Sequence, residues 1–331
     1  MNLVLLTGLI HNEREGIMSF NDAKWVWMNG AYLPWDKANI HVSAHALHYG
    51  SGVFEGIRCY DTIEGPALFR IDDHVERFFS SAHTHGMEIP YTAEQLTDAT
   101  AELTRRNEFS NCYVRPICFR GSRSLSVDPK SCPVEVAILA WPWAPMHGAE
   151  SISRGIQVCI SPWKKFHSDM MPTTAKASGQ YVNSMLALRD ALDRGYKEAL
   201  LLDVDGYLAE AASENLFLVR NGGLWTNDER YSILLGITRD SIIQIARDLG
   251  YTVNIGALTV EDLRNSDEVF LTGTAAEVVP VCQVDGENIS DGQCGVVTRH
   301  IQEQFKKIVS GENSDYRRWL HLVTKAAALT A

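Results

Sequence analysis

The sequence predicts a two-domain protein of the α/β or α+β class, on three observations. The chain has 331 residues, which is about two average domains in length. Strand and helix patterns alternate irregularly along it, with hairpins rather than strict β-α-β order. The segment Trp141–Gly148 holds two prolines and a glycine, which is typical of a domain boundary. We therefore expect a smaller N-terminal domain over 23–140, a linker over 141–150 and a larger domain over 151–331.

Composition narrows the class of partner. Hydrophobic residues make up 45% and charged residues 21%, the balance of an ordinary soluble globular protein, which excludes disorder for the bulk of the chain. The formal net charge is −11, from 30 basic and 41 acidic residues. Because such a surface repels polyanions, we expect neither nucleic acid nor a membrane as a partner. Small-molecule chemistry is favoured.

The cysteines and the N-terminus bear on location. The seven cysteines are odd in number and form no Cys-x-x-Cys pair, which favours reduced thiols in a cytoplasm. The apolar segment from Leu3 to Ile10 is short and lacks a basic flank, so neither a signal peptide nor a membrane span is expected. Residues 1–22 are assigned to an N-terminal extension, with Met18 as the hypothetical native start.

Local signals predict the elements of the first domain in order. An Asn-Gly turn at Asn29 predicts a hairpin between 24–29 and the residues that follow Gly30. Asp72 is expected to cap a helix that ends near Gly86. The capping-box pattern Thr92-x-x-Gln95 predicts a second helix, to about Asn107. Apolar runs predict strands at 51–61, 66–71, 111–120 and 134–143.

The second domain shows the same mixture of signals. An Asp205-Gly206 pair predicts a further hairpin turn. Strands are expected at 156–161, 215–220 and 268–271. Helices are expected at 178–194, from Thr238 to Gly250, and at 296–308.

Three histidines near the N-terminus need an interpretation. The spacing of His41, His45 and His48 would bring their imidazoles to one face of a helix. No carboxylate lies between them, unlike the pattern of zinc-binding helices, so packing or hydrogen-bonding histidines are favoured over metal ligands. No metal site is expected. Motifs for nucleotide binding and for serine hydrolases are absent from the sequence.

Lys176 and two acids stand out by their surroundings. A lone loop lysine is usually a solvated charge, but Lys176 lies among small residues before a helix that begins near Tyr181. Such a dry setting suits a catalytic lysine, since it disfavours the charged amine. Glu210 and Glu214 lie in an apolar run after a turn, where a carboxylate is costly unless a cation meets it. The alternative is that both are ordinary turn acids.

Two threonines mark candidate anion sites. Thr238 opens a helix, and Thr274 follows a strand beside Gly273. Both positions offer backbone N–H groups and a hydroxyl, as a phosphate site does. Each pattern alone is equally typical of a capping threonine.

Six segments taken together resemble a known family. They are His45–Arg58, Tyr113–Pro116, the residues around Lys176, Glu210–Phe217, Gly236–Arg239 and Thr272–Glu277. In this order they resemble the branched-chain amino-acid aminotransferases, which are fold-type IV pyridoxal 5′-phosphate (PLP) enzymes. The resemblance runs from about Trp25 to Leu320. It implies a smaller N-terminal domain and a larger C-terminal pseudo-barrel domain that binds PLP.

The resemblance implies roles at the cofactor. Lys176 would form the Schiff base with PLP and shuttle the proton between Cα and C4′. Glu210 would pair with the pyridine nitrogen, and Tyr181 would bind the 3-oxygen of the ring. The phosphate-binding residues would be Arg77, Ile237, Thr238 and Thr274.

It implies roles at the substrate as well. Tyr113 and the backbone N–H groups of Thr274 and Ala275 would bind the α-carboxylate. Arg115 would swing to bind the second carboxylate of glutamate. The remaining substrate-binding residues would be Tyr49, Phe54, Arg58 and Trp143.

Subunit contacts and two departures from the family pattern complete the expectations. Tyr49 and the loop Leu125–Val127 are expected from a second subunit, so the active form would be a homo-oligomer, at least a dimer. Met146 stands where relatives often carry a tyrosine, and the loop 121–127 is less glycine-rich than usual. Both bear on substrate range rather than on reaction type.

The function expected is transamination between L-leucine, L-isoleucine or L-valine and 2-oxoglutarate, by a ping-pong mechanism through pyridoxamine phosphate. The alternatives are a D-amino-acid or (R)-amine transaminase, or an aminodeoxychorismate-lyase-like enzyme, of the same fold. A non-catalytic PLP-binding protein would lack Lys176, Tyr181 or Glu210, and all three are present. Within the fold type, Phe54–Arg58 and the Tyr113-x-Arg115 pair favour the L-branched-chain type.

Overall fold

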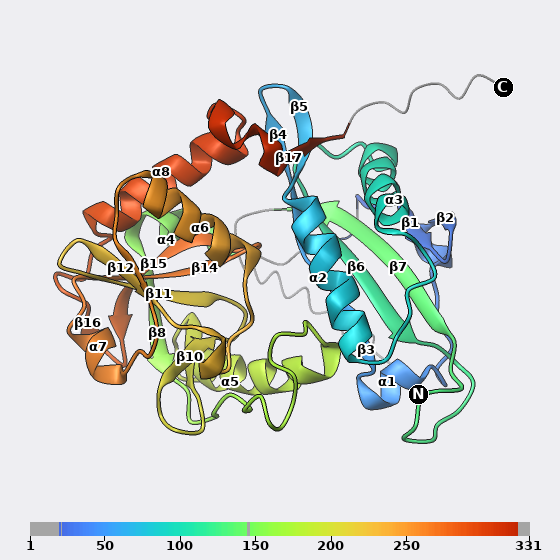
Figure 1. Cartoon of the computed structure of the whole chain (residues 1–331), viewed down its shortest axis with the longest axis horizontal. Helices are drawn as coiled ribbons and strands as arrows, with labels where there is room; N and C mark the ends of the chain where they lie inside the picture. The colour runs from blue at the N-terminus through green and yellow to red at the C-terminus, as the bar shows by residue number, and fades with distance from the viewer. Residues whose placement is uncertain (1–19, 21, 144–145, 324–331) are drawn as a thin grey trace, which may run out of the picture.

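The structure is a computed structural model that describes residues 20, 22–143 and 146–323. Most of the predicted N-terminal extension lies outside the described residues, including residues 1–17 and Met18. Residues 144 and 145 of the predicted linker also lie outside them. The described chain forms two sheets with helices packed against them (Figure 1).

The first sheet is built mostly from the N-terminal part of the chain. Its strand order is β17-β5-β4-β6-β7-β1-β2, with β3 paired to β6. The strands are β1 (Trp25–Met28), β2 (Ala31–Pro34), β3 (Gly52–Phe54), β4 (Ile57–Thr62), β5 (Gly65–Phe69), β6 (Cys112–Arg120), β7 (Val134–Pro142) and β17 (Leu320–Leu322). Helices α1 (His45–Tyr49), α2 (Ile71–Thr84) and α3 (Ala93–Arg106) accompany it.

The second sheet follows the Trp141–Gly148 segment. Its order is β10-β9-β8-β15-β14-β11-β12-β13, with β16 paired to β15. The strands are β8 (Ile156–Ile160), β9 (Glu198–Leu202), β10 (Leu208–Ala211), β11 (Asn215–Arg220), β12 (Gly223–Thr226), β13 (Val253–Ile255), β14 (Glu268–Gly273), β15 (Glu277–Val284) and β16 (Glu287–Asn288). Its helices are α4 (Gly148–Arg154), α5 (Tyr181–Asp193), α6 (Ile237–Asp248), α7 (Val260–Arg264) and α8 (Val296–Val309).

The two sheets form a left and a right lobe in Figure 1, with α2 at the face where they meet. Strands β1–β7 belong to the first sheet and β8–β16 to the second, and β17 returns from the C-terminal part of the chain to pair with β5. Phe69 of β5 packs against Phe305 of α8 and Trp319, with ring centroids 5.6 and 5.7 Å apart. The C-terminal segment therefore ties the lobes together, while the domain boundaries themselves stay a prediction.

Several local predictions are confirmed. The first hairpin turns at Asn29 and Gly30, which both have positive φ, as a two-residue hairpin turn requires. The capping box at Thr92 is present in full, and α3 begins at the next residue. Strand β11 has the predicted bounds.

Other local predictions are wrong. Helix α2 begins at Ile71, and its N-cap is Arg70 in the left-handed region rather than Asp72. Arg70 holds this conformation because its guanidinium binds the carboxylates of Asp73 and Asp240. The strand predicted over 51–61 is two strands, β3 and β4, which Glu55 and Gly56 separate.

No helix in the described part of the chain is long and apolar enough to cross a membrane.

Candidate active site

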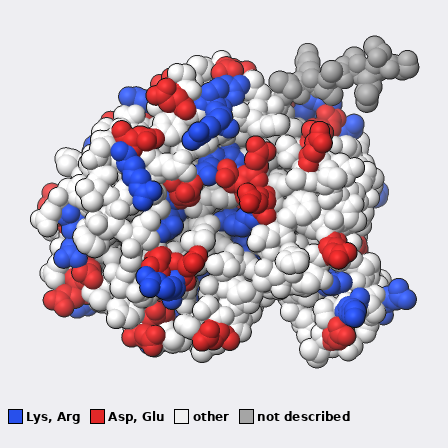
Figure 2. Space-filling model, viewed as in Figure 1, with Lys and Arg blue, Asp and Glu red and all other residues white. Residues whose placement is uncertain are grey.

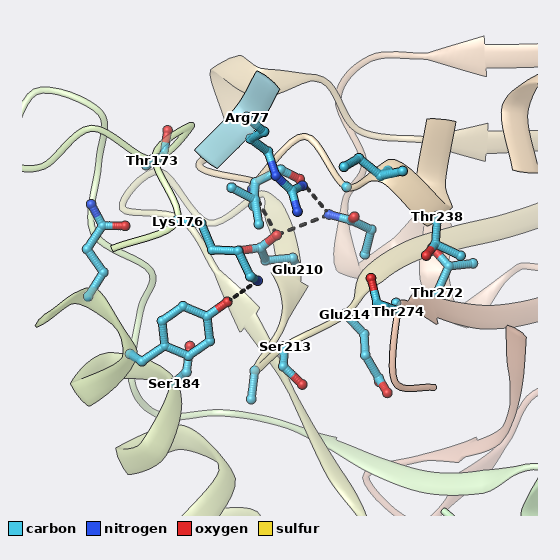
Figure 3. Close-up of a pocket in the computed structure, with 18 of the residues that line it drawn as sticks. Arg77, Thr173, Lys176, Ser184, Glu210, Ser213, Glu214, Thr238, Thr272 and Thr274 are labelled. Carbon is cyan, nitrogen blue, oxygen red and sulfur yellow. Dashed lines mark hydrogen bonds between the residues drawn. The ribbon is translucent and has the colours of Figure 1, made fainter. Parts of the chain in front are cut away.

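A cavity lies between the lobes and collects side chains from both of them. Figure 2 shows Lys, Arg, Asp and Glu side chains around a hollow near the centre of this face. Figure 3 shows the residues inside, with Lys176 and Glu210 near the middle. The charged lining residues are Arg77, Lys165, Lys176, Glu210 and Glu214.

Lys176 lies in the segment between β8 and α5, held by its backbone. Its N–H donates to Ser81 Oγ at 3.0 Å, and its carbonyl accepts from the N–H of Phe54 at 3.0 Å. Its Nζ donates to the Tyr181 hydroxyl at 2.6 Å. Burial, with the charge of Arg77 second, lowers the pKa of Lys176 to about 8. A neutral, nucleophilic amine is therefore available close to neutral pH.

Tyr181 is the first residue of α5 and shares this dry setting. Burial raises the pKa of its hydroxyl to about 12, and the Glu210 carboxylate adds to the rise. The hydroxyl therefore stays protonated and can donate a hydrogen bond to an oxygen in the cavity.

Arg77 reaches the cavity from α2 and is clamped by a buried acid. Its Nε and one terminal nitrogen donate to the two oxygens of Glu55, at 2.7 and 2.9 Å. His74 Nδ1 lies 2.7 Å from the same carboxylate. Although burial opposes it, Arg77 and His74 hold the pKa of Glu55 well below its usual range. The guanidinium is therefore fixed in orientation at the cavity wall.

Glu210 lies on β10 with each carboxylate oxygen bonded. Lys165 Nζ lies 2.8 Å from Oε1. Oε2 accepts from the backbone N–H of Leu234 at 2.9 Å and from Asn215 Nδ2 at 3.1 Å. The sequence predicts that this buried acid needs a cation, and Lys165 supplies one from within the chain.

The opposite end of the cavity offers backbone donors. Helix α6 begins at Ile237 with no side-chain cap, so its first N–H groups face the cavity without an intrahelical partner. The cap, Gly236, has no room for a side chain, because a Cβ there would lie 2.0 Å from Asn215 Oδ1. Thr272 Oγ1 is buried without a hydrogen-bond partner in the described chain. These donors, with Thr274 of the β14–β15 turn, fit a phosphate group.

A second cavity adjoins the first and shares Lys176, Tyr181, Ser213 and Thr274 with it. Its aromatic and apolar lining residues are Phe54, Tyr113, Trp141, Trp143, Met146 and Ala275. Arg115 lies among these rings, with its guanidinium carbon 4.6 Å from the Phe54 ring centroid. In the described chain its side chain hydrogen-bonds the Tyr113 hydroxyl and no carboxylate, and its Nε is buried without a partner. A guanidinium in this setting is suited to a carboxylate ligand.

Tyr113 stands close to the backbone of this cavity. A Cβ at Gly56 would lie 1.8 Å from the Tyr113 hydroxyl, so only glycine allows this approach. Arg115 donates weakly to the same hydroxyl, at 3.4 Å.

Two predicted substrate residues are outside the lining of both cavities in a single copy of the chain. Arg58 is behind the cavity wall, where it pairs with Glu277 at 3.2 Å and lies 5.6 Å from the Trp143 ring centroid. Tyr49 is 47% exposed, and its hydroxyl donates to the Leu125 carbonyl at 2.9 Å. Within one copy of the chain, Tyr49 is not among the lining residues of either cavity.

The three N-terminal histidines hydrogen-bond locally. His45 is buried between Ser51 Oγ and the Ser126 carbonyl, at 2.6 and 2.9 Å. His48 contacts the Val42 carbonyl at 3.0 Å. His41 contacts Ser43 Oγ at 2.7 Å. Each ring thus has a partner of its own.

The comparison with known proteins decides the family. The model of the family "Amino-transferase class IV" matches residues 52–284, which is most of the chain. The chain belongs to the class IV aminotransferases.

Named class IV aminotransferases match over nearly their full length. The "Branched-chain-amino-acid aminotransferase" of Escherichia coli (strain K12) is 41% identical over 309 residues, 93% of this chain and 100% of that protein. The protein of the same name from Pseudomonas aeruginosa is 40% identical over 298 residues, 90% of this chain and 97% of that protein. The structure of the T.th. branched-chain amino acid aminotransferase with pyridoxamine 5′-phosphate has a TM-score of 0.89 at 45% identity, covering 91% of this chain and 99% of that one. The mixed α/β fold with two sheets is therefore that of fold-type IV aminotransferases.

Sequence reasoning about this class IV aminotransferase missed three residues of the site. Glu55 lies within one of the six segments but received no role, although an acid between apolar strand residues is itself a signal. Lys165 gives no local signal, since it follows another lysine in a loop. His147 entered the prediction only as part of the linker.

His147 joins a buried acidic cluster next to the first cavity. Its Nε2 lies 2.8 Å from Glu214 Oε1, and Glu198 lies close enough that the three together could hold a metal ion. Although burial lowers it, pairing with Glu214 raises the pKa of His147. Burial and the nearby Glu214 raise the pKa of Glu198 to about 8. One oxygen of each acid has no hydrogen-bond partner in the described chain.

This cluster makes stability depend on pH. Folding raises the pKa of Glu198 from 4.5 to about 8, so its burial costs progressively more as pH rises through this window. Glu198→Gln removes the charge and keeps the acceptor for the N–H groups of Ala199 and Ala212. We expect the variant to be more stable than wild type at pH 8 by about 1 kcal/mol or more, and equal at pH 5.

Thermal unfolding of the two proteins between pH 5 and 9 checks this. Glu150→Gln, on the exposed face of α4, is the matched control and should follow wild type. Parallel pH profiles for wild type and Glu198→Gln would contradict the expectation. A divalent cation bound at the cluster would make Glu198→Gln less stable than wild type, because the variant would then lose a ligand.

Proposed function

We propose that this chain is a PLP-dependent transaminase that moves the amino group between L-leucine, L-isoleucine or L-valine and 2-oxoglutarate in a ping-pong cycle. The observation that carries the proposal is the buried Lys176 amine, 2.6 Å from the Tyr181 hydroxyl, between a carboxylate and an uncapped helix N-terminus. The names of the matched relatives support it. So do solved structures of the T.th. enzyme "with Pyridoxamine 5'-phosphate" and "Complexed with N-(5'-Phosphopyridoxyl)-L-Glutamate".

The residues of the first cavity fit PLP. The phosphate would be held by Arg77, by the N–H groups of Ile237 and Thr238, and by Thr274. Tyr181 would bind the 3-oxygen, and Glu210 would face the ring nitrogen. When bound, PLP supplies an electron sink for the pair of electrons left at Cα.

Lys176 has two duties in this proposal. Its amine would hold the cofactor through the aldehyde carbon. In its free form the same amine would move a proton between Cα of the substrate and C4′. The lowered pKa of Lys176, about 8, makes the neutral amine available for this transfer.

The second cavity would hold the substrate. Tyr113 and the backbone N–H groups of Thr274 and Ala275 would bind the α-carboxylate. The aliphatic side chain would pack against Phe54 and Trp143, as the apolar lining favours. Arg115 would bind the second carboxylate of glutamate, because in the described chain its side chain hydrogen-bonds the Tyr113 hydroxyl and no carboxylate.

We also propose a homo-oligomer, at least a dimer, in the cytoplasm. Leu47, Tyr49, Leu125 and Val127 are large and exposed on one surface of a single copy, where a second copy would cover them. Tyr49 and Leu125–Val127 of one copy would then close the substrate cavity of the other. All seven cysteines are free thiols, which suits a reducing compartment.

A visible absorption spectrum of the purified protein tests the function. We expect bound PLP whose band is converted to that of pyridoxamine phosphate by L-leucine and not by D-alanine. Conversion by D-alanine alone would favour the D-amino-acid transaminase of the same fold. A protein that binds no PLP when it is supplied would refute the proposal.

Arg115→Leu tests the second substrate. Removing the guanidinium should lower kcat/KM for L-glutamate by about 100-fold, since a charge-assisted pair in a desolvated cavity is lost. The value for L-leucine should change less than about fivefold, because no carboxylate of leucine meets this residue. Half-reactions followed by absorption give both numbers. Equal losses for the two substrates would remove Arg115 from side-chain recognition.

A further inference from the structure

Lys165 is buried at the back of the cofactor cavity and contacts the acid of β10. It lies in the loop after β8, fixed by its N–H, which donates to the Leu202 carbonyl at 2.8 Å. Its side chain is 9% exposed, and that of Glu210 is 8% exposed. The ammonium lies 2.8 Å from Glu210 Oε1. Such a pair is desolvated, so each charge acts strongly on the other.

The other oxygen of Glu210 is bonded independently of Lys165. Oε2 accepts from the Leu234 N–H and from Asn215 Nδ2, and Asn215 also donates to the Leu234 carbonyl at 2.9 Å. These neutral donors hold the carboxylate in place. Lys165 is therefore not needed to orient Glu210, and its distinct contribution is a positive charge.

That charge bears on a proton shared between Glu210 and a ring nitrogen. In a hydrogen-bonded pair of a carboxylate and a pyridine, the proton rests on the partner that holds it more tightly. An ammonium in contact with the carboxylate would stabilise it more than it would oppose a protonated ring, because a ring nitrogen bonded to Glu210 would lie farther from the ammonium and Coulomb energy falls with distance. The charge of Lys165 thus favours the carboxylate with a protonated ring.

Neighbouring charges do not replace it. Arg77 is paired with Glu55, and both lie on the lobe of the first sheet, opposite Lys165 and Glu210. Lys176 has a lowered pKa and is directed to Tyr181. Of the ion pairs in the described part of the chain, that with Lys165 is the one that includes Glu210.

We propose that Lys165 is a positioning residue for the proton of the cofactor: by pairing with Glu210 it keeps that acid a carboxylate and so keeps the proton on the ring nitrogen, where it strengthens the electron sink. This inference rests on the proposed function, because it takes Glu210 as the partner of the ring nitrogen. It adds a residue that acts through Glu210 without touching the cofactor.

The test measures the ring nitrogen directly in the holoenzyme. PLP labelled with ¹⁵N in the ring is bound to wild type, and its ¹⁵N chemical shift reports whether that nitrogen is protonated. Glu210→Gln provides the reference for a neutral ring. Lys165→Gln keeps a neutral donor near Glu210 Oε1 and removes only the charge, and Lys165→Met is a second neutral variant in case the first does not fold.

We expect a protonated ring in wild type and a signal in Lys165→Gln that moves most of the way to that of Glu210→Gln. Lys165→Arg should restore the wild-type signal, since it restores the charge. Lys164→Gln, an exposed neighbour, is the matched control and should leave the signal unchanged. The rate of Cα deprotonation in Lys165→Gln should fall between those of wild type and Glu210→Gln.

The outcomes separate two failures. A protonated ring in both neutral variants at full occupancy would overturn the role of Lys165 and leave the proposed function intact. A wild-type signal equal to that of Glu210→Gln would show that Glu210 is not the ring partner and would overturn this inference together with that assignment. If Lys165→Arg also lost the ¹⁵N signal of the protonated ring, the site would need the shape of lysine rather than its charge. That result would also contradict the proposal.

Discussion

Replacing Lys176 with alanine is expected to lower the rate of transamination by roughly 10⁴-fold or more, the upper range for a positioned acid–base group. In the proposed function the Lys176 amine would both bind the cofactor and move the Cα proton. Its side chain makes one hydrogen bond, to Tyr181, so little of the fold depends on it. The backbone contacts to Ser81 and Phe54 remain in the variant.

A single-turnover experiment with L-leucine measures this loss. Borohydride reduction followed by intact mass should attach the cofactor to wild type and not to Lys176→Ala. Lys164→Ala is the matched control, because Lys164 is exposed and its amine reaches only the Val204 carbonyl. Melting temperatures of the three proteins should agree within a few degrees. Turnover by Lys176→Ala at the wild-type rate would refute the assignment.

The sequence predicts a turn or a helix start well when the residues that determine it lie within a few positions of one another. The Asn29–Gly30 turn and the capping box at Thr92 each need nothing beyond their own segment, and both are confirmed. Strand β15 escaped prediction because Pro280 interrupts its apolar run. Its pairing with β8 begins at Val281, after the proline, so the missing N–H costs the sheet no bond there.

The residues of the site also differ in how far the sequence predicts them. Lys176, Tyr181 and Glu210 were expected together from the resemblance, and the structure brings them to one cavity. The partners that set their charges were not expected, since Lys165 lies far from Glu210 in sequence. The left-handed N-cap of α2, Arg70, was missed for the same reason, because its guanidinium binds Asp240 in the other lobe. Pairings between distant segments leave no trace in a local pattern.

Glu55 is such a distant partner, and removing its charge should destabilise the protein strongly. Glu55→Gln leaves the largely buried Arg77 guanidinium with the Leu235 carbonyl and one neutral amide oxygen, in place of two charged oxygens at 2.7 and 2.9 Å. Breaking a buried ion pair on one side costs about 3 to 5 kcal/mol, because the remaining charge is desolvated and unpaired. We expect the free energy of unfolding of the cofactor-free protein to fall by about 3 kcal/mol.

Denaturant unfolding of single and double variants isolates the pair. Glu76→Gln is the matched control, since Glu76 is the exposed neighbour of Arg77 on α2 and should cost less than about 0.5 kcal/mol. Glu55→Gln with Arg77→Gln removes both charges, so the double variant should lose less than the sum of the two single losses. Additive losses would mean that the two side chains are not coupled. Since Arg77 takes its orientation from Glu55, coupling of about 2 kcal/mol or more would also explain why an acid with no contact to the substrate stands at this wall of the cavity.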